Sequence, residues 1–288
     1  MKSIIVLTDF SAAARCAAEL ALVIATQLGA EAWLVNVYPI TPYLPRVGNL
    51  VLPEITAAQK RHESMGKLND EVRRLENIKL AVSSGLRPVV RPIALEGQLA
   101  DRTAALAHRK KSLFIIMGIS EKSYGDVLFK GDVWDVLQQV RCPVFAVPAD
   151  GERPGIRHIL FATDLEAEDE PAISELVGIS ARLKTRLTVG HVSPPVLIPD
   201  FAEERRSSAF SERLSRLYPQ IEYTNTRASK TFDALEKVSS EKHADLIALR
   251  YRKHPFWYHM FNQNPLKDFL VEGKTPLLIF PEITARHE

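Results

Sequence analysis

The chain has 288 residues, 46% of them hydrophobic and 25% charged, which is the balance of an ordinary globular protein of about two domains. Its net charge of +2 argues against a nucleic-acid partner, because proteins that bind nucleic acids usually carry a basic stripe or a strongly basic tail. Two cysteines, Cys16 and Cys142, cannot form a disulfide framework, and neither has the spacing of a zinc site, so we expect no metal.

The apolar run at the start of the sequence is interrupted at Thr8 and Asp9, which makes it too short for a signal peptide. Elsewhere no apolar run reaches the length that a membrane-spanning helix needs. We therefore expect a cytoplasmic protein without a membrane partner.

The first predicted elements are a strand, a helix and a second strand. Ile4–Leu7 is apolar without alternation, which is typical of a strand buried on both faces. Ser11 is a candidate helix N-cap, and small and apolar residues then recur at helical spacing until Gly29, which we expect to end the helix. Trp33–Val37 is the next predicted strand.

A proline-rich connection follows, from Pro39 to about Pro53, and it suits either a lid or a spacer. A charged amphipathic helix is predicted from about Ile55 to Leu75, and Pro88–Ala94 is a predicted strand whose internal proline favours the edge of a sheet. The remaining predicted elements alternate helix, strand, helix and strand: Leu99–His108, Leu113–Met117, Val133–Val140 and Val144–Val147.

The chain also contains an internal repeat. IIVLTDF (Ile4–Phe10) is echoed by ILFATDL (Ile159–Leu165), so that residue 9 corresponds to residue 164. RCPVFAVP (Arg141–Pro148) is matched by KTPLLIFP (Lys274–Pro281), and the polar Gly/Pro-rich segment ADGERPGI lies between the copies. We therefore expect a first domain of residues 1–148, a linker of residues 149–156 and a second domain of residues 157–288.

Alternating strands and helices of this kind predict a parallel, doubly wound α/β sheet in each domain. Ligands of such sheets bind beyond the carboxyl ends of the strands, where the winding reverses. Asp9, Val37 and Gly118 fall at these ends and are candidate site residues.

At these residues the sequence resembles the universal stress protein family in its tandem two-domain form. The resemblance rests on TDFS after the first strand, NVY after the second, and MG…CPVFAVP at the close of the first copy. It implies two five-stranded parallel sheets of strand order 3-2-1-4-5 and pairing of the units through their last strands. For this chain it implies an intramolecular pseudo-dimer through Phe145–Val147 and Leu277–Phe280, and it leaves a homodimer open.

Many members of that family bind ATP through a loop of the form glycine, two residues, glycine, nine residues, then glycine and a serine or threonine. Gly118 and Gly131 match the first and last glycines, but Glu121 replaces the second glycine and Asp132 replaces the hydroxyl residue. Asp132 also suits a helix N-cap, where its carboxylate would occupy the N–H groups that a phosphate needs. Two like charges about 4 Å apart cost on the order of 4 kcal/mol at an effective dielectric of 20, and Lys122 and Lys130 offset part of this.

Two further residues match the family's nucleotide site. Asp9 matches the aspartate that reaches the adenine or ribose, and Val37 matches a residue that lines the adenine pocket. Asp9 equally suits a residue that ends a strand and begins a turn, so both interpretations stay open.

The second domain lacks the glycine motif, because Arg250 stands opposite Gly118 and Asn264 stands opposite Gly131, with Pro265 at the first helical position. The basic residues that begin at Arg250 indicate either a solvated loop or a small-anion site. The aromatic segment His254–Phe261 suits internal packing or an exposed partner patch, and its two histidines lack a third metal ligand.

The acidic run Glu166–Glu170 fits the electropositive start of a helix and would repel a phosphate near Asp164. The leading hypothesis is therefore a non-enzymatic stress protein that binds a protein partner or a small ligand and uses no cofactor. The alternative is an ATP-binding stress sensor that uses only the first domain, with the vestigial site Asp9, Val37, Gly118, Gly131 and Asp132. An enzyme is disfavoured, because no glycine-rich loop follows the first strand and no Ser–His–Asp or Cys–His motif is present.

Overall fold

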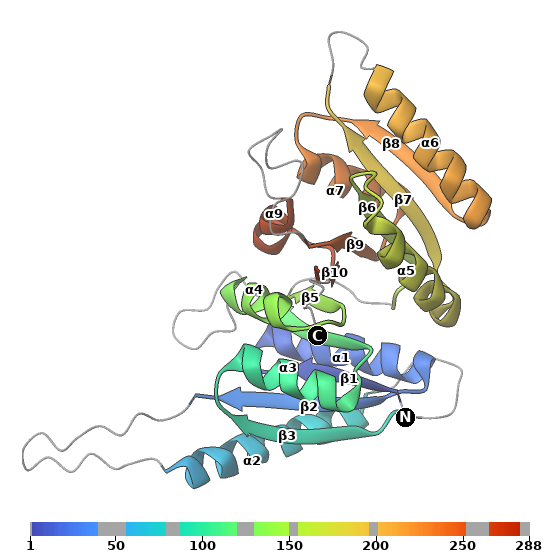
Figure 1. Ribbon diagram of the computed structural model, residues 1–288. Helices are drawn as coiled ribbons and strands as arrows, with labels where there is room; N and C mark the ends of the chain where they lie inside the picture. Colours follow the sequence, from blue (N-terminus) through green and yellow to red (C-terminus); the bar gives the residue numbers. More distant parts are fainter. Residues whose placement is uncertain are drawn as a thin grey trace, which may run out of the picture. The chain divides into compact units, whose positions relative to one another are not determined.

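The computed structural model describes residues 2–39, 56–78, 87–119, 130–149, 155–195, 201–251 and 265–282. Its internal contacts divide the chain into two compact units, Met1–Cys142 and Pro143–Glu288. In both units helices flank a mainly parallel sheet, which is the predicted α/β class (Figure 1). Within the described ranges no helix is both long enough and apolar enough to cross a membrane.

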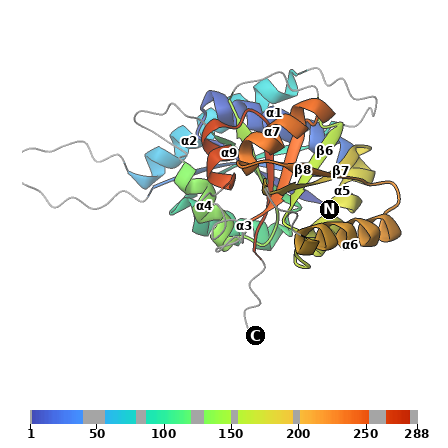
Figure 2. The same cartoon turned by 90° about the horizontal axis from the view of Figure 1, so that it is seen from above.

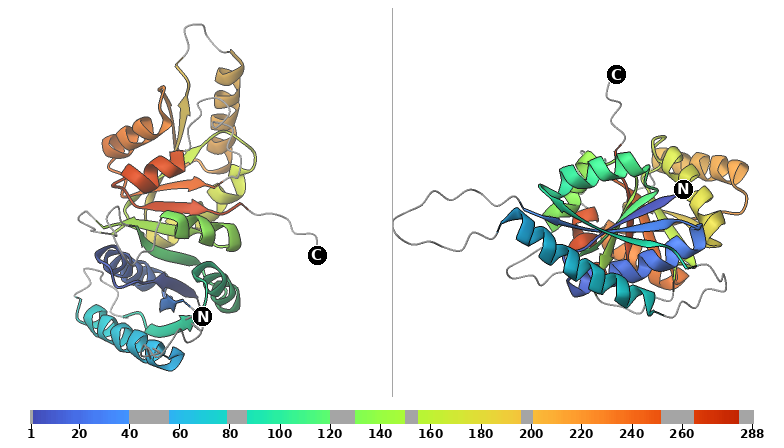
Figure 3. Two further views of the ribbon diagram at one scale, coloured as in Figure 1. Left: turned by 90° about the vertical axis from the view of Figure 1, so that its left-hand side faces the viewer. Right: turned by 90° about the horizontal axis from the view of Figure 1, so that it is seen from below.

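The first unit alternates strand and helix from its start. Helices α1 and α2 cover one face of the sheet, and α3 and α4, which contact each other, cover the opposite face (Figure 3). The elements are β1 (Ser3–Leu7), α1 (Ala12–Leu28), β2 (Glu31–Tyr38), α2 (Ala57–Glu76), β3 (Val90–Glu96), α3 (Leu99–Lys110), β4 (Phe114–Ile119) and α4 (Lys130–Gln139).

The second unit repeats this alternation after one additional strand. Helices α5 and α6 lie on one side of its strands, and α7 and α9 lie on the other (Figure 2). The elements are β5 (Val144–Pro148), β6 (His158–Thr163), α5 (Asp169–Leu183), β7 (Arg186–Ser193), α6 (Phe201–Leu217), β8 (Glu222–Arg227), α7 (Thr231–Lys242), β9 (Leu246–Arg250), α9 (Pro265–Glu272) and β10 (Leu277–Phe280).

The strand order confirms the predicted topology in both halves. It is β3-β2-β1-β4-β5 in the first and β10-β9-β6-β7-β8 in the second, so each half has the order 3-2-1-4-5 in its own numbering. The closing strands β5 and β10 also pair, antiparallel, with Phe145 opposite Leu278. By sequence β5 closes the first repeat, whereas by its contacts it belongs to the second unit.

The helix ends follow from local chemistry that the sequence shows. Ser11 caps α1 as predicted, because its hydroxyl accepts a hydrogen bond from the Ala14 N–H at 3.2 Å. Gly29 ends the same helix in the left-handed conformation, at φ 60°. Thr56 and Gln59 form a capping box at the start of α2.

Five strands, β1, β4, β5, β6 and β10, are buried along their whole length. This confirms the prediction for Ile4–Leu7 and places the core on both faces of the central strands, where each buried aliphatic side chain contributes about 1.5–3 kcal/mol. Strand β3, which contains Pro92, is outermost in its half, as a proline in a strand favours. Residues 40–55 of the proline-rich connection lie outside the described part of the chain.

Candidate functional site

The predicted site residues of the first half lie at the carboxyl ends of adjacent strands. Asp9 follows β1, Val37 is near the end of β2, and Gly118 is near the end of β4. Since β1 pairs in parallel with both β2 and β4, these three residues share one edge of the sheet. Gly131 and Asp132 belong to the first turn of α4, the helix that follows β4.

The turn after β1 is built by its own polar side chains. The Phe10 N–H donates to the Thr8 Oγ1 at 3.0 Å, and the Ser11 N–H donates to the Asp9 Oδ1 at 2.9 Å. Phe10 takes the left-handed conformation, at φ 68°, which is uncommon for a residue other than glycine. Asp9 therefore shapes the turn; its contact with a nucleotide remains a prediction.

The second half repeats this turn. The Leu165 N–H donates to the Thr163 Oγ1 at 3.0 Å, the Glu166 N–H donates to the Asp164 Oδ1 at 3.3 Å, and Leu165 is again left-handed, at φ 67°. One added contact distinguishes the copies, because the Asp169 carboxylate accepts a 2.8 Å hydrogen bond from the Thr163 hydroxyl. Asp164 is only 4% exposed, so this turn is closed by its own helix.

A side chain from the second strand of each half supports the turn. In the first half the Asn36 amide donates to the Thr8 carbonyl oxygen at 2.7 Å and accepts from the Ser64 hydroxyl of α2 at 2.7 Å. In the second half the His191 ring takes this place, with Nδ1 2.8 Å from the Thr163 carbonyl oxygen.

The His191 ring also contacts the following helix. Its Nε2 lies 2.7 Å from the Glu203 Oε1 of α6, and the Ser193 hydroxyl donates to the same carboxylate oxygen at 3.4 Å. The ring is only 9% exposed, so the carboxyl edge of β6 and β7 is filled by protein side chains that bind each other.

Gly118 has a structural reason to be glycine. A Cβ atom at this position would lie 2.3 Å from the carbonyl carbon of Ala13, in the first turn of α1. The registers Leu7–Met117 and Ala162–Leu249 place Arg250 at the equivalent position of the second half. The glycine is therefore explained by close helix packing, whether or not a ligand binds beside it.

Asp132 does not stand at the N-cap position of its helix, so the prediction of that position was wrong. Helix α4 begins at Lys130, which places Asp132 inside the first turn, where a carboxylate is still favoured by the helix dipole. The predicted helix began too late, at Val133, because glycine followed by aspartate is typical of the residues just before a helix. Glu121 and Lys122 of the predicted loop lie outside the described residues, as do Asn264 and the aromatic segment His254–Phe261.

The acidic run of the second half lies where the sequence predicted, at the start of α5, which has Asp169 and Glu170 in its first turn. Two of its carboxylates are paired with arginines of α6. Arg206 lies 2.9 Å from Glu166, and Arg213 lies 2.7 Å from Glu170. These pairs connect α5 and the turn before it to α6, and they lower the negative charge at this edge.

Comparison with known proteins gives a family for the first half. Residues 1–148 match the sequence profile of the Universal stress protein family. Universal stress protein MJ0531 of Methanocaldococcus jannaschii is 28% identical over 149 residues, which are 51% of this chain and 81% of the relative.

Solved structures match the whole chain. A universal stress protein from Archaeoglobus fulgidus has a TM-score of 0.70 at 14% identity, over 97% of this chain and 98% of that one. A putative universal stress protein from Pseudomonas aeruginosa has a TM-score of 0.60 at 16% identity, over 98% and 93% of the two chains. At these identities the likeness shows a shared fold.

Proposed function

Because the chain belongs to the universal stress protein family in its tandem two-domain form, we propose that it is a non-enzymatic binding protein. In this proposal the family's nucleotide site is lost from the second half and weakened in the first. The protein then acts in the stress response by binding a protein partner or a small ligand, in the cytoplasm and without a cofactor.

The observation that carries this proposal is the closed edge of the second half. His191 and Glu203 bind each other at 2.7 Å where a ligand of such a sheet would enter, and Arg250 takes the place of the loop's first glycine. A triphosphate would have to displace these contacts and enter beside the buried Asp164 carboxylate. The residues at this edge of the second half therefore do not fit a triphosphate.

In the first half the main obstacle is the carboxylate of Asp132 in the first turn of α4. A phosphate that approaches this helix end meets a like charge, at a cost of about 4 kcal/mol for 4 Å and an effective dielectric of 20. This corresponds to about a thousandfold in affinity. The presence of Gly118 is not evidence for a retained phosphate loop, because close packing against α1 is enough to require a glycine there.

The second candidate function, ATP sensing by the first half alone, is favoured by the more open edge there. Asp9 is partly exposed, and neutral Asn36 stands where the second half has the His191–Glu203 pair. Asp9, Val37 and Gly118 would then contact the nucleotide. In the second unit both ring nitrogens of His158 and of His191 are engaged by protein atoms, which argues against an acid–base role for these two side chains.

Calorimetric titration of the full chain with Mg-ATP separates the two candidates. We expect no saturable heat at low micromolar nucleotide. Saturable binding of one nucleotide per chain, lost on Asp9→Ala, would instead establish the sensor and overturn the proposal.

A further inference from the structure

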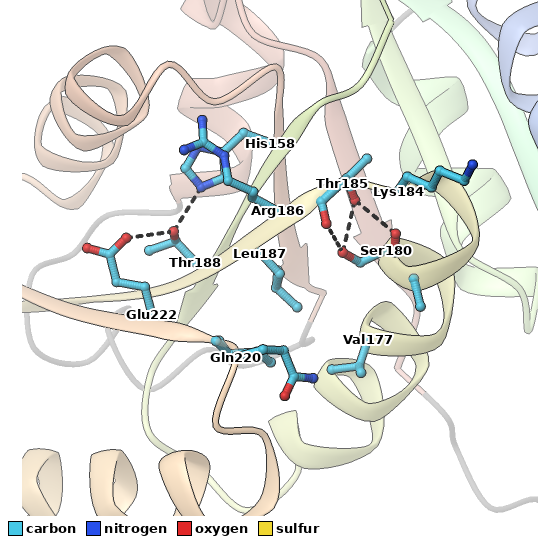
Figure 4. A pocket seen from close by; sticks show the side chains of 12 residues that line it. His158, Val177, Ser180, Lys184, Thr185, Arg186, Leu187, Thr188, Gln220 and Glu222 are labelled. Carbon is cyan, nitrogen blue, oxygen red and sulfur yellow. Dashed lines mark hydrogen bonds between the residues drawn. The ribbon is translucent and has the colours of Figure 1, made fainter. Parts of the chain in front are cut away.

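The second unit contains a cavity of about 470 Å³ at the amino-terminal ends of β6, β7 and β8, which is the edge opposite to the one described above (Figure 4). This volume is within the range of about 300–1,000 Å³ that is typical of small-molecule sites. Helix α5 forms one wall, and the segment that joins α6 to β8 forms another.

The lining of this cavity is largely apolar. Its apolar members are Val177 and Ala181 of α5, Leu187 of β7 and Ile221, which precedes β8. Leu187 and Ile221 are buried to 7% and 8% exposure, so they form a fixed apolar floor. An apolar ring placed on this floor would gain about 25 cal/mol for each Å² of surface removed from water.

Three polar side chains of the lining, His158, Thr188 and Ser180, are already hydrogen-bonded to protein atoms. The His158 ring is held between the Lys242 carbonyl oxygen at 2.7 Å and the Thr188 hydroxyl at 2.8 Å. The Ser180 hydroxyl donates to the Thr185 carbonyl oxygen at 2.7 Å (Figure 4). A ligand can therefore cover these groups without leaving a donor or acceptor unpaired.

The charged side chains of the lining that form no ion pair among the described residues are basic. Lys184 and Arg186 are exposed and make no ion pair within the described ranges, whereas the Glu222 carboxylate is paired with Lys242. The carboxyl end of α5 carries about half a negative charge, which two full positive charges outweigh. The rim therefore attracts an anion.

We propose that this cavity binds a small organic anion, with an apolar ring or short chain on the floor and a carboxylate or sulfonate at the rim, which Lys184 and Arg186 flank from opposite sides (Figure 4). The site is at the amino ends of the strands, away from the edge where ligands of such sheets usually bind. It stands independently of the proposed function, which concerns nucleotide at the other edge.

The first unit offers an internal comparison. It has a cavity of about 420 Å³ at the equivalent place of the repeat, where Leu22 corresponds to Val177. Its lining has a single basic residue, Arg87, whose guanidinium donates to the Glu76 carbonyl oxygen. Without two unpaired cations this cavity should not select an anion.

The test uses two probes of the same shape, 1-naphthoate and the neutral 1-naphthamide, titrated calorimetrically into the full chain. We expect saturable binding of one naphthoate and about tenfold weaker binding of the amide, since two solvent-weakened Coulomb attractions are lost. Lys184→Gln with Arg186→Gln should lower naphthoate affinity about tenfold and leave the amide unchanged. Arg182→Gln, in the last turn of α5 but outside the lining, should change neither.

A second pair of variants locates the site. Ala181→Trp should abolish binding of both probes by filling the cavity, whereas Val89→Trp at the first-unit cavity should leave both unchanged. Thermal unfolding checks that each variant is folded. Absent naphthoate binding, equal affinity for the two probes, or full naphthoate binding in folded Ala181→Trp would each overturn the proposal, and Mg-ATP binding would not.

Discussion

Glu236 of α7 is a carboxylate in an unfavourable place. Its Oε1 is buried without a hydrogen-bond partner, and burial raises the pKa of this carboxyl, an effect that Lys274 partly opposes. A raised pKa in the folded state means that the folded chain binds this proton more tightly than the unfolded chain does. The stability that Glu236 contributes is therefore present below its unfolded pKa of about 4.5 and is lost as the pH rises through the folded value.

Glu236→Gln tests this effect, because the amide cannot ionise. We expect the variant to be more stable than the parent at pH 7 and the difference to shrink toward pH 4, measured by urea denaturation at several pH values. Glu241→Gln, an exposed position on the same helix, should show no such trend. A Glu236→Gln difference that is independent of pH would contradict the assignment.

Gly118 supports a second prediction at the scale of one residue. Gly118→Ala would place a methyl group 2.3 Å from backbone atoms of α1, and we expect a loss of about 1–3 kcal/mol in the free energy of unfolding as the helix shifts. Gly178→Ala is the matched control, since nothing lies within 4 Å of its Cβ and alanine favours the interior of α5 by about 0.5–1 kcal/mol. The midpoints of denaturant unfolding measure both changes in stability. If Gly118→Ala leaves the free energy of unfolding unchanged, α1 adapts to the added methyl group and the prediction is wrong.

At the scale of elements, variants at the start of α4 test whether acidic residues there prevent the first half from binding ATP. Glu121→Gly with Asp132→Ser removes both departures from the family's loop, and we expect Mg-ATP affinity in the first half to rise, by up to about a thousandfold for one charge at 4 Å. Calorimetry measures the change. Asp135→Ser, an exposed aspartate of the same helix, should give no gain. A double variant that gains nothing would place the defect elsewhere.

Most elements could be predicted from the sequence because their determinants are local. The unbroken apolar run of Ile4–Leu7, the N-cap Ser11 and the left-handed Gly29 each act within a few residues. The internal repeat then allowed the elements of the second half to be predicted from those of the first. The alternation of strand and helix predicted a parallel, doubly wound sheet. The start of α4 was misplaced, because Gly131 and Asp132 resemble a boundary and yet lie inside the helix.

The candidate sites were less predictable, because they depend on which side chains face each other across elements. Nothing local to His191 indicates that Glu203 of α6 will lie 2.7 Å from its ring. Phe10 adopts the left-handed conformation although it is not a glycine, so the sequence does not indicate this conformation. The one available clue was the repeat itself, which aligns Asn36 with His191 and so indicates that both support the same turn.

For the whole molecule, the closing strand β5 joins the two repeats in an unequal way. It belongs to the first repeat by sequence, yet it pairs with β10 and is grouped with the second unit by its contacts. A protease site inserted in residues 149–156 should therefore cut the chain without releasing its parts. We expect the two fragments to elute together from a sizing column.

Phe145→Asp is the variant that should separate these fragments after cleavage, because it buries a charge opposite Leu278. Circular dichroism checks that both fragments remain folded. Fragments of the parent chain that separate without denaturant would contradict a stable β5–β10 pair.

The same strand pair sets an order of events during synthesis. Strand β5 is complete at Pro148, but its antiparallel partner β10 begins only at Leu277. At roughly 5–20 residues per second, the ribosome leaves this apolar strand without that neighbour for on the order of ten seconds. An unpaired strand edge of this composition favours self-association, so we expect the nascent chain to be prone to aggregate until its last strand emerges.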